Sequence, residues 1–86
     1  MKLKKEFIVH NTGDETILVP TGAADFSGIV RGNKTVGFIF ECLKDDTTRD
    51  EIIAKMREKF DAPVGAAERD VDKALDEIRK IGALDE

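Results

Sequence analysis

The 86-residue sequence has no tryptophan and no tyrosine, and it contains one cysteine, one histidine and one serine. A hydrolase with a serine or cysteine nucleophile needs a base and an orienting group beside it, and Ser27, His10 and Cys42 can form such a set only once. A zinc site needs three or four His, Cys or carboxylate ligands, and one histidine with one cysteine cannot supply the usual set. We therefore expect no enzyme activity, no catalytic residue, no metal and no cofactor.

Long hydrophobic runs are also absent. After the basic segment 2–5, only the three apolar residues 7–9 precede His10, whereas an export signal needs an apolar core of roughly 7–15 residues. No stretch approaches the ~18 apolar residues of a membrane span. A single cysteine cannot form an internal disulfide, so nothing points to an oxidising compartment. These features predict a cytoplasmic protein without a membrane partner.

The first third of the chain is predicted to form short strands. Residues 7–10 and 16–19 are β-prone, and the turn-forming segment 11–15 between them predicts an antiparallel hairpin. Pro20 should end the second strand because it lacks the N–H that a sheet ladder needs. Residues 26–31 are a plausible third strand.

The rest of the chain has helical periodicity. We predict helices from Asn33 to about Lys44, from Thr48 to Phe60, and from about Ala66 to Ile81. Three strands followed by three helices predict an α+β fold, a single domain over residues 1–86, with the outline of a winged helix-turn-helix.

Two residues carry more local predictions. Gly37 lies inside the first predicted helix, where glycine costs about 1 kcal/mol relative to alanine, so it indicates a tight contact. Pro63 suits the first turn of the third helix.

A resemblance to a known family covers nearly the whole chain. The segment N-K-T-V-G-F-I-F-E-C-L-K-D-D-T-T-R-D-E-I (33–52) resembles the pattern N-x-T-x-x-F-I-W-x-x-L-x-x-x-x-T-x-x-E-I of the PqqD-like family. The ending L-D-E-I-R-K-I-G-A-L (75–84), the hairpin 11–20 and the segment 25–30 are similar as well. Three departures stand out: Gly32 replaces an apolar residue, Phe40 replaces the usual Trp, and Pro63 with Gly65 replaces an acidic stretch.

The resemblance implies a function without chemistry. Members of this family look like peptide chaperones of pyrroloquinoline quinone biosynthesis and related pathways, also called RiPP recognition elements. They bind the leader of a ribosomally synthesised precursor peptide and present it to a modifying enzyme, often a radical S-adenosylmethionine (SAM) enzyme. The leader adds a strand to the edge of the third strand, and its side chains enter the groove between that strand and the third helix.

Carried onto this sequence, the resemblance implies ten peptide-binding residues. The strand contributes Ser27, Gly28, Ile29, Val30 and Arg31, and the helix contributes Val71, Asp72, Leu75, Ile78 and Arg79. Arg31, Lys73 and Arg79 can meet acidic leader residues. Without the resemblance, the strand is an ordinary solvated one, and the apolar helix residues are core.

Other functions remain open at this level. A winged-helix DNA-binding or regulatory domain shares the outline, but the net charge of −4 is opposite to that of a DNA reader, so we expect no nucleic-acid partner. An acyl carrier needs a serine at a helix start, and Ser27 lies in a predicted strand. An open sheet edge can also pair with a second copy, so a homodimer is a further alternative.

Overall fold

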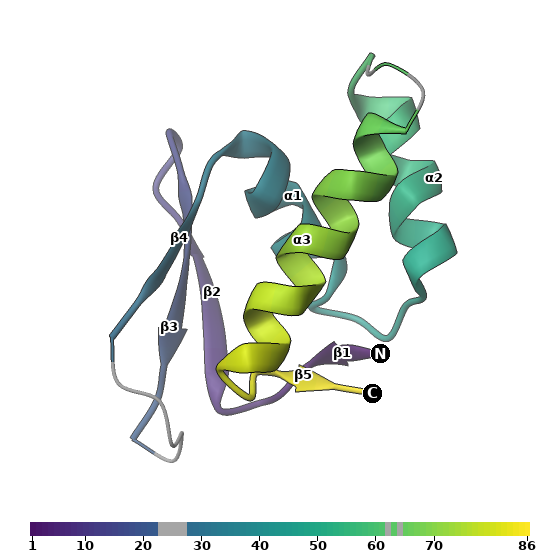
Figure 1. The fold of residues 1–86 in the computed structure, drawn as a ribbon. Helices are drawn as coiled ribbons and strands as arrows, with labels where there is room; N and C mark the ends of the chain where they lie inside the picture. The colour runs from purple at the N-terminus through teal and green to yellow at the C-terminus, as the bar shows by residue number, and fades with distance from the viewer. Residues whose placement is uncertain (23–27, 62, 64) are drawn as a thin grey trace.

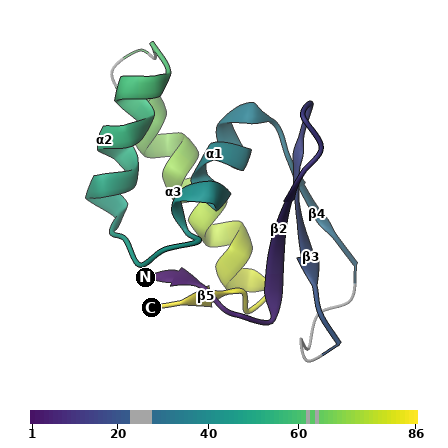
Figure 2. The same cartoon turned by 180° about the vertical axis from the view of Figure 1, so that it is seen from behind.

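The structure, a computed structural model, describes residues 1–22, 28–61, 63 and 65–86. Within these residues the chain forms two small sheets and three helices (Figure 1). In chain order the elements are β1 (Lys2–Leu3), β2 (Phe7–Asn11), β3 (Thr16–Pro20), β4 (Val30–Gly32), α1 (Lys34–Cys42), α2 (Arg49–Lys59), α3 (Ala66–Lys80) and β5 (Leu84–Asp85). The larger sheet lies on one side of α1 and α3, with α2 on the other (Figures 1 and 2). The predicted α+β fold, three antiparallel strands followed by three helices, is confirmed.

The larger sheet has the order β2-β3-β4, and both neighbouring pairs are antiparallel. Hydrogen bonds at the two ends of the hairpin set the pattern of its ladder. The N–H of Thr12 donates to the carbonyl of Glu15 at 2.9 Å, and the N–H of Thr21 donates to the carbonyl of Glu6 at 2.7 Å. Hydrogen-bonded pairs alternate along an antiparallel ladder, so the odd-numbered residues of β3 face β2 and the even-numbered ones face β4.

This alternation explains why the third strand starts later than predicted. Leu18 of β3 lies opposite Val30, the first residue of β4. The next even-numbered residue is Pro20, which has no N–H to donate toward residue 28, so the ladder ends there. Gly28 and Ile29 consequently precede the strand, and Gly28 has a φ of +115°. The prediction of strand structure at these two residues is wrong.

A second, two-stranded sheet joins the two ends of the described chain (Figure 1). β1 pairs with β5 antiparallel, with Leu3 opposite Leu84. The N–H of Leu3 donates to the carbonyl of Leu43 at 2.9 Å, and the N–H of Lys4 donates to that of Ala83 at 2.8 Å. Both leucines are buried, so this small sheet covers one end of the core.

The junction between β4 and α1 follows the predicted local signals. The backbone N–H of Val36 donates to the side-chain oxygen of Asn33 at 2.9 Å, which confirms Asn33 as the helix cap. Gly37 packs against Thr16 of β3. A Cβ on this glycine would lie 2.4 Å from the Thr16 hydroxyl oxygen and 2.7 Å from the Thr16 Cβ. The prediction of a tight contact at Gly37 is therefore confirmed.

The other two helices begin differently from each other. Thr48 caps α2 by accepting from the N–H of Glu51 at 3.2 Å, while the Glu51 carboxylate accepts from the hydroxyl of Thr47. α3 begins directly after Gly65, which has a φ of +87° and no side chain to cap the helix. Pro63 thus precedes α3 rather than occupying its first turn. Within the described residues, no helix is long and apolar enough to cross a membrane.

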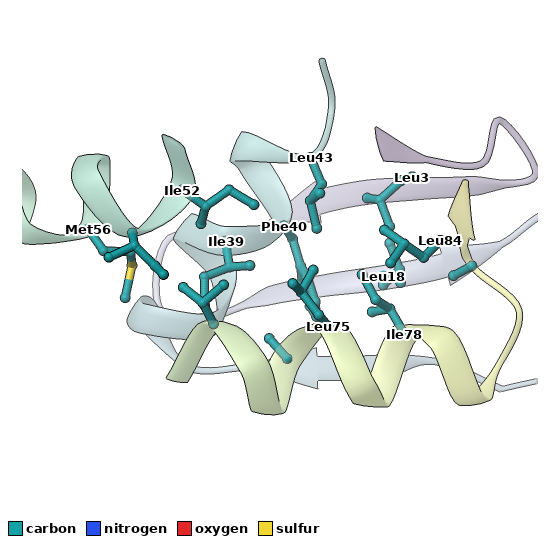
Figure 3. Packing of buried hydrophobic residues seen from close by; sticks show 14 of the residues in the cluster. Leu3, Leu18, Ile39, Phe40, Leu43, Ile52, Met56, Leu75, Ile78 and Leu84 are labelled. Carbon is teal, nitrogen blue, oxygen red and sulfur yellow. The ribbon is translucent and has the colours of Figure 1, made fainter. Parts of the chain in front are cut away.

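The core lies between the inner face of the larger sheet and the helices. Figure 3 shows Leu75 of α3 beside Phe40 of α1, and Ile78 of α3 beside Leu18 of β3. All four side chains are buried. The apolar stripe of α3 thus holds the helix against the sheet and fixes the distance between α3 and β4.

Candidate functional site

The outer edge of β4 is open. β3 occupies one side of this strand, and no residue of the described chain pairs with the other side. Val30 and Gly32 lie opposite the β3 residues that face β4, so the N–H and C=O of Arg31 point away from the sheet. The Arg31 side chain is exposed, and its guanidinium lies 4.0 Å from the Glu15 carboxylate. β4 can therefore offer an incoming strand one donor and one acceptor from the same residue.

A cavity of about 320 Å³ lies between β4 and α3. Small residues form part of its wall: Gly32 of β4 and Ala74 of α3, both of which are buried. A Cβ on Gly32 would lie 2.8 Å from a methyl carbon of Val36, so the glycine lets β4 approach α1 closely. The cavity is lined by residues of β4, the start of α1 and one flank of α3: Arg31, Gly32, Asn33, Thr35, Val36, Asp70, Lys73, Ala74 and Glu77.

Charges of both signs surround this cavity. Arg31 and Lys73 are cationic, and Asp70 and Glu77 are anionic. In the part of the chain that the structure describes, none of Asp70, Lys73 and Glu77 forms an ion pair or a side-chain hydrogen bond. These three side chains are consequently available to a ligand, and their mixed signs suit a ligand that carries both acidic and basic groups.

The predicted apolar helix residues do not line the cavity. Val71, Leu75 and Ile78 are 0%, 2% and 0% exposed and belong to the core. Their burial agrees with the reading of these residues as core, and their contact with a peptide stays a prediction. They lie one helix face away from the cavity, because a hydrophobic period identifies the buried stripe and not the flank beside it.

Asp72 and Arg79 lie on the opposite flank of α3 from the cavity. The guanidinium of Arg49 in α2 donates two hydrogen bonds to the Asp72 carboxylate, of 2.6 and 3.0 Å. Arg79 donates to the carboxylate of Glu86 at 2.7 Å. The hydrogen bond from Arg49 holds the pKa of Asp72 below its ordinary value, and the hydrogen bond to Glu86 raises the pKa of Arg79. The structure thus places both residues in ion pairs away from β4.

The predicted strand residues are placed only in part. Val30 and Arg31 belong to β4, and Gly28 and Ile29 lie immediately before it. Ile29 is 46% exposed. Ser27 lies outside the described residues, as does Phe26. Of the nine predicted site residues that the structure describes, only Arg31 lines the cavity.

Sequence reasoning placed Lys73 beside the groove but missed the other residues of this flank of α3. Asp70, Ala74 and Glu77 recur with helical spacing immediately beside the stripe of Val71 and Ile78. This spacing shows that they share one flank. It does not show that the flank faces β4, because that depends on how α3 crosses the sheet.

Two residues capable of chemistry, Cys42 and His10, lie within the described part of the chain. Cys42 is half-buried in α1, and burial raises the pKa of its thiol, which disfavours the reactive thiolate. His10 is exposed on β2. Among the described residues, no group of three or more His, Cys, Asp or Glu side chains is arranged to hold a metal.

Comparison with known proteins identifies the family. The family model described as Coenzyme PQQ synthesis protein D (PqqD) matches residues 15–84. The chain belongs to the PqqD family. A solved structure, that of TbiB1 in complex with the TbiA(beta) leader peptide, has the same fold as this PqqD-family chain, with a TM-score of 0.81. The two are 16% identical, and the match covers 99% of this chain and 95% of the other. No curated protein matches the sequence.

One of the departures from the family pattern, Gly32, lies in the cavity wall. Gly32 removes an apolar side chain from β4, and the side chain of Val36 occupies the space beside it. Phe40, in place of the usual Trp of the PqqD family, is 1% exposed and fills the core. The Gly32 substitution therefore shapes the cavity wall of this family member, whereas Phe40 packs in the core behind it.

Proposed function

We propose that this protein binds the leader segment of a ribosomally synthesised precursor peptide by strand addition at β4. The observation that carries the proposal is the open edge at Arg31, which lies beside a cavity that α3 completes. Main-chain hydrogen bonds to an edge strand give affinity, and pockets for alternate side chains give specificity. Membership of the PqqD family and the fold shared with a protein solved in complex with a leader peptide support this function.

The binding residues that we propose are those of the cavity wall. The leader pairs with the outward N–H and C=O of Arg31 and sets side chains against Ala74 and Val36. Lys73 and Arg31 meet acidic leader groups, while Asp70 and Glu77 meet basic ones. Of the residues expected from the sequence, Gly28 and Ile29 extend the docking edge beyond β4, and the buried Val71, Leu75 and Ile78 support the wall from within the core.

The protein is proposed to act without catalysis of its own. It presents the bound precursor to a modifying enzyme, which we expect to be a radical SAM enzyme because the PqqD-like family has such partners. We place this work in the cytoplasm, where precursor peptides are made, and assign it to residues 1–86 acting as one domain. The net charge of −4 and the single cysteine are consistent with this setting.

A matched pair of variants tests the strand addition. Arg31→Pro removes the outward N–H and leaves the bonds between β3 and β4 intact, whereas Arg31→Ala removes the guanidinium and keeps the N–H. A buried acceptor without its donor costs about 1–3 kcal/mol. We therefore expect Arg31→Pro to bind about tenfold or more weakly than Arg31→Ala.

The measurement is a titration of ¹⁵N-labelled protein with synthetic leader segments of precursors encoded near its gene. Amide shifts should concentrate at residues 28–33 and 70–77. Equal affinity of two folded variants, or shifts confined to the hairpin turn at 12–15, would refute the proposed site. A second copy of the chain could pair with the β4 edge in place of the peptide. Amide shifts at residues 28–33 that change with protein concentration in the absence of peptide would reveal such pairing.

The same protein can be tested for DNA binding. The helix α3, which would be the DNA-recognition helix, contains five acidic and four basic residues, and one of the basic residues, Arg79, is paired with Glu86. We expect no binding to random duplex DNA at 50 mM salt, where electrostatic binding is strongest. Micromolar binding there would favour the winged-helix alternative.

A further inference from the structure

A second open edge lies on the other side of the larger sheet. β2 pairs with β3 along one side only, among the residues that the structure describes. The alternation of the ladder turns the main-chain groups of Phe7, Val9 and Asn11 away from β3. The N–H of Phe7 already donates a hydrogen bond to the carbonyl of Lys4 at 3.0 Å. The remaining outward groups are the N–H of Val9, the N–H of Asn11 and the carbonyls of all three residues.

This edge lacks the features that protect an edge strand from pairing. Edge strands are usually kept apart by charged side chains, proline, bulges or short length. β2 spans five residues in unbroken register with β3 and contains neither a charged residue nor a proline. Its Ile8 is 55% exposed, the most exposed large hydrophobic side chain in the described chain. Such a strand favours a partner that can extend the sheet.

The surface beside the edge is basic, although the chain as a whole is acidic. A cavity of about 530 Å³ lies in the corner between β1 and β2, and its charged lining residues are four lysines, Lys2, Lys4, Lys5 and Lys44, and two acids, Glu6 and Asp85. Lys44 is paired with Glu41. The other three lysines form no ion pair with any residue that the structure describes. Because lysines outnumber the acidic residues here, this corner favours an occupant that brings negative charge.

A second copy of this chain supplies both the strand and the charge. Two β2 strands can pair antiparallel about a two-fold axis at Val9, which places Phe7 of each opposite Asn11 of the other. In this register four main-chain hydrogen bonds can form: each Val9 N–H donates to the carbonyl of the other Val9, and each Asn11 N–H donates to the carbonyl of the other copy's Phe7. The hairpin turn of one copy then extends past Phe7 of the other toward Lys4 and Lys5. This turn carries Asp14, which is exposed and unpaired among the described residues.

We infer that the protein self-associates through its β2 edges into a symmetric dimer with a continuous six-stranded sheet. Lys4 and Lys5 of each copy bind the acidic turn of the other. Both β4 edges stay free in this dimer, so each copy keeps its candidate peptide site. The inference does not depend on what binds at β4.

Sedimentation velocity from 10 µM to 1 mM protein tests this interface at 50 and 500 mM NaCl. We expect reversible dimers at the high end of this range, weakened by salt. Lys4→Glu with Lys5→Glu should reduce the association constant about tenfold or more, and Asp14→Lys should do the same. The combined triple variant should restore association, because it restores opposite charges across the interface. Lys80→Glu, on an exposed part of α3, is the matched control and should have no such effect.

Three results would overturn the inference: a monomer at 1 mM, association that none of the charge variants alters, or association that Arg31→Pro abolishes. The last result would place the interface at β4. A glutamate-rich decapeptide serves as the probe for a different acidic occupant. If it shifts the amides of residues 7–11 while increasing protein concentration does not, the β2 edge binds another polypeptide and the dimer is refuted.

Discussion

Replacing Gly37 by alanine tests how closely α1 must approach β3. In an ordinary helix interior this change stabilises by about 1 kcal/mol, because alanine has the higher helix propensity. Here the new Cβ would lie 2.4 Å from the Thr16 hydroxyl oxygen and 2.7 Å from the Thr16 Cβ. The hydroxyl can rotate away, but the Cβ of Thr16 is fixed to the backbone of β3.

The steric cost therefore outweighs the propensity gain. Overpacking a well-packed site costs about 1–3 kcal/mol, and a contact with a fixed Cβ belongs at the upper end of this range. We expect Gly37→Ala to lower the free energy of unfolding by about 1–2 kcal/mol after the propensity gain of ~1 kcal/mol is subtracted. α1 and β3 would separate slightly, and the wall of the cavity at Val36 would move with α1.

Urea denaturation followed by far-ultraviolet circular dichroism is the suitable assay, because the chain has no tryptophan or tyrosine to report by fluorescence. Ala54→Gly, at an exposed position of α2, calibrates the propensity scale in the same protein and should cost about 1 kcal/mol. Thr16→Gly removes the obstacle, so in combination with it Gly37→Ala should become favourable. A Gly37→Ala protein that is about 1 kcal/mol more stable than the parent would refute the reasoning.

Three further predictions concern single side chains. Asn33→Ala should lower the free energy of unfolding by about 1 kcal/mol, measured in urea, because α1 loses its side-chain cap. The pKa of Asp72 is lowered by Arg49, so this pair stabilises the fold above the ordinary carboxyl pKa of about 4 and ceases to do so as the pH falls through the lowered value. The stability difference between the parent and Asp72→Asn should accordingly shrink between pH 6 and pH 3. Burial raises the pKa of Cys42, so the folded protein should react with iodoacetamide at pH 8 more slowly than the urea-unfolded chain.

The sequence predicted those parts of the fold that local signals determine. Asn33 and Thr48 cap their helices as expected, and α3 starts at the predicted residue, Ala66. The hairpin also formed in the expected place, because a turn-rich segment between two β-prone runs is a short-range signal. Each of these features depends on residues that are close together in the chain.

The features that were missed depend on contacts between distant residues. β1 and β5 are two residues long and have no periodicity of their own, and they pair where Leu3 and Leu84 are buried against the core. β4 starts late because Pro20, on another strand, cannot donate to it. The α3 residues that line the cavity lie on the flank next to Val71 and Leu75, and the hydrophobic period of α3 identifies its buried stripe but not which flank faces β4. The pairing of Asp72 with Arg49 likewise depends on where α2 lies.

The short outward edge of β4 has a consequence for how long a peptide can stay bound. Only Arg31 turns both of its main-chain groups outward within this strand, and two net hydrogen bonds contribute about 1–3 kcal/mol together. A dissociation constant of 1 mM already requires about 4 kcal/mol, so most of the affinity must come from side chains in the cavity. If these bring the constant to the micromolar range, association rates of about 10⁵–10⁷ M⁻¹s⁻¹ imply that the peptide leaves within roughly 0.1 to 10 seconds. One copy of the protein can then serve many peptides in succession, without any conformational change needed to release them.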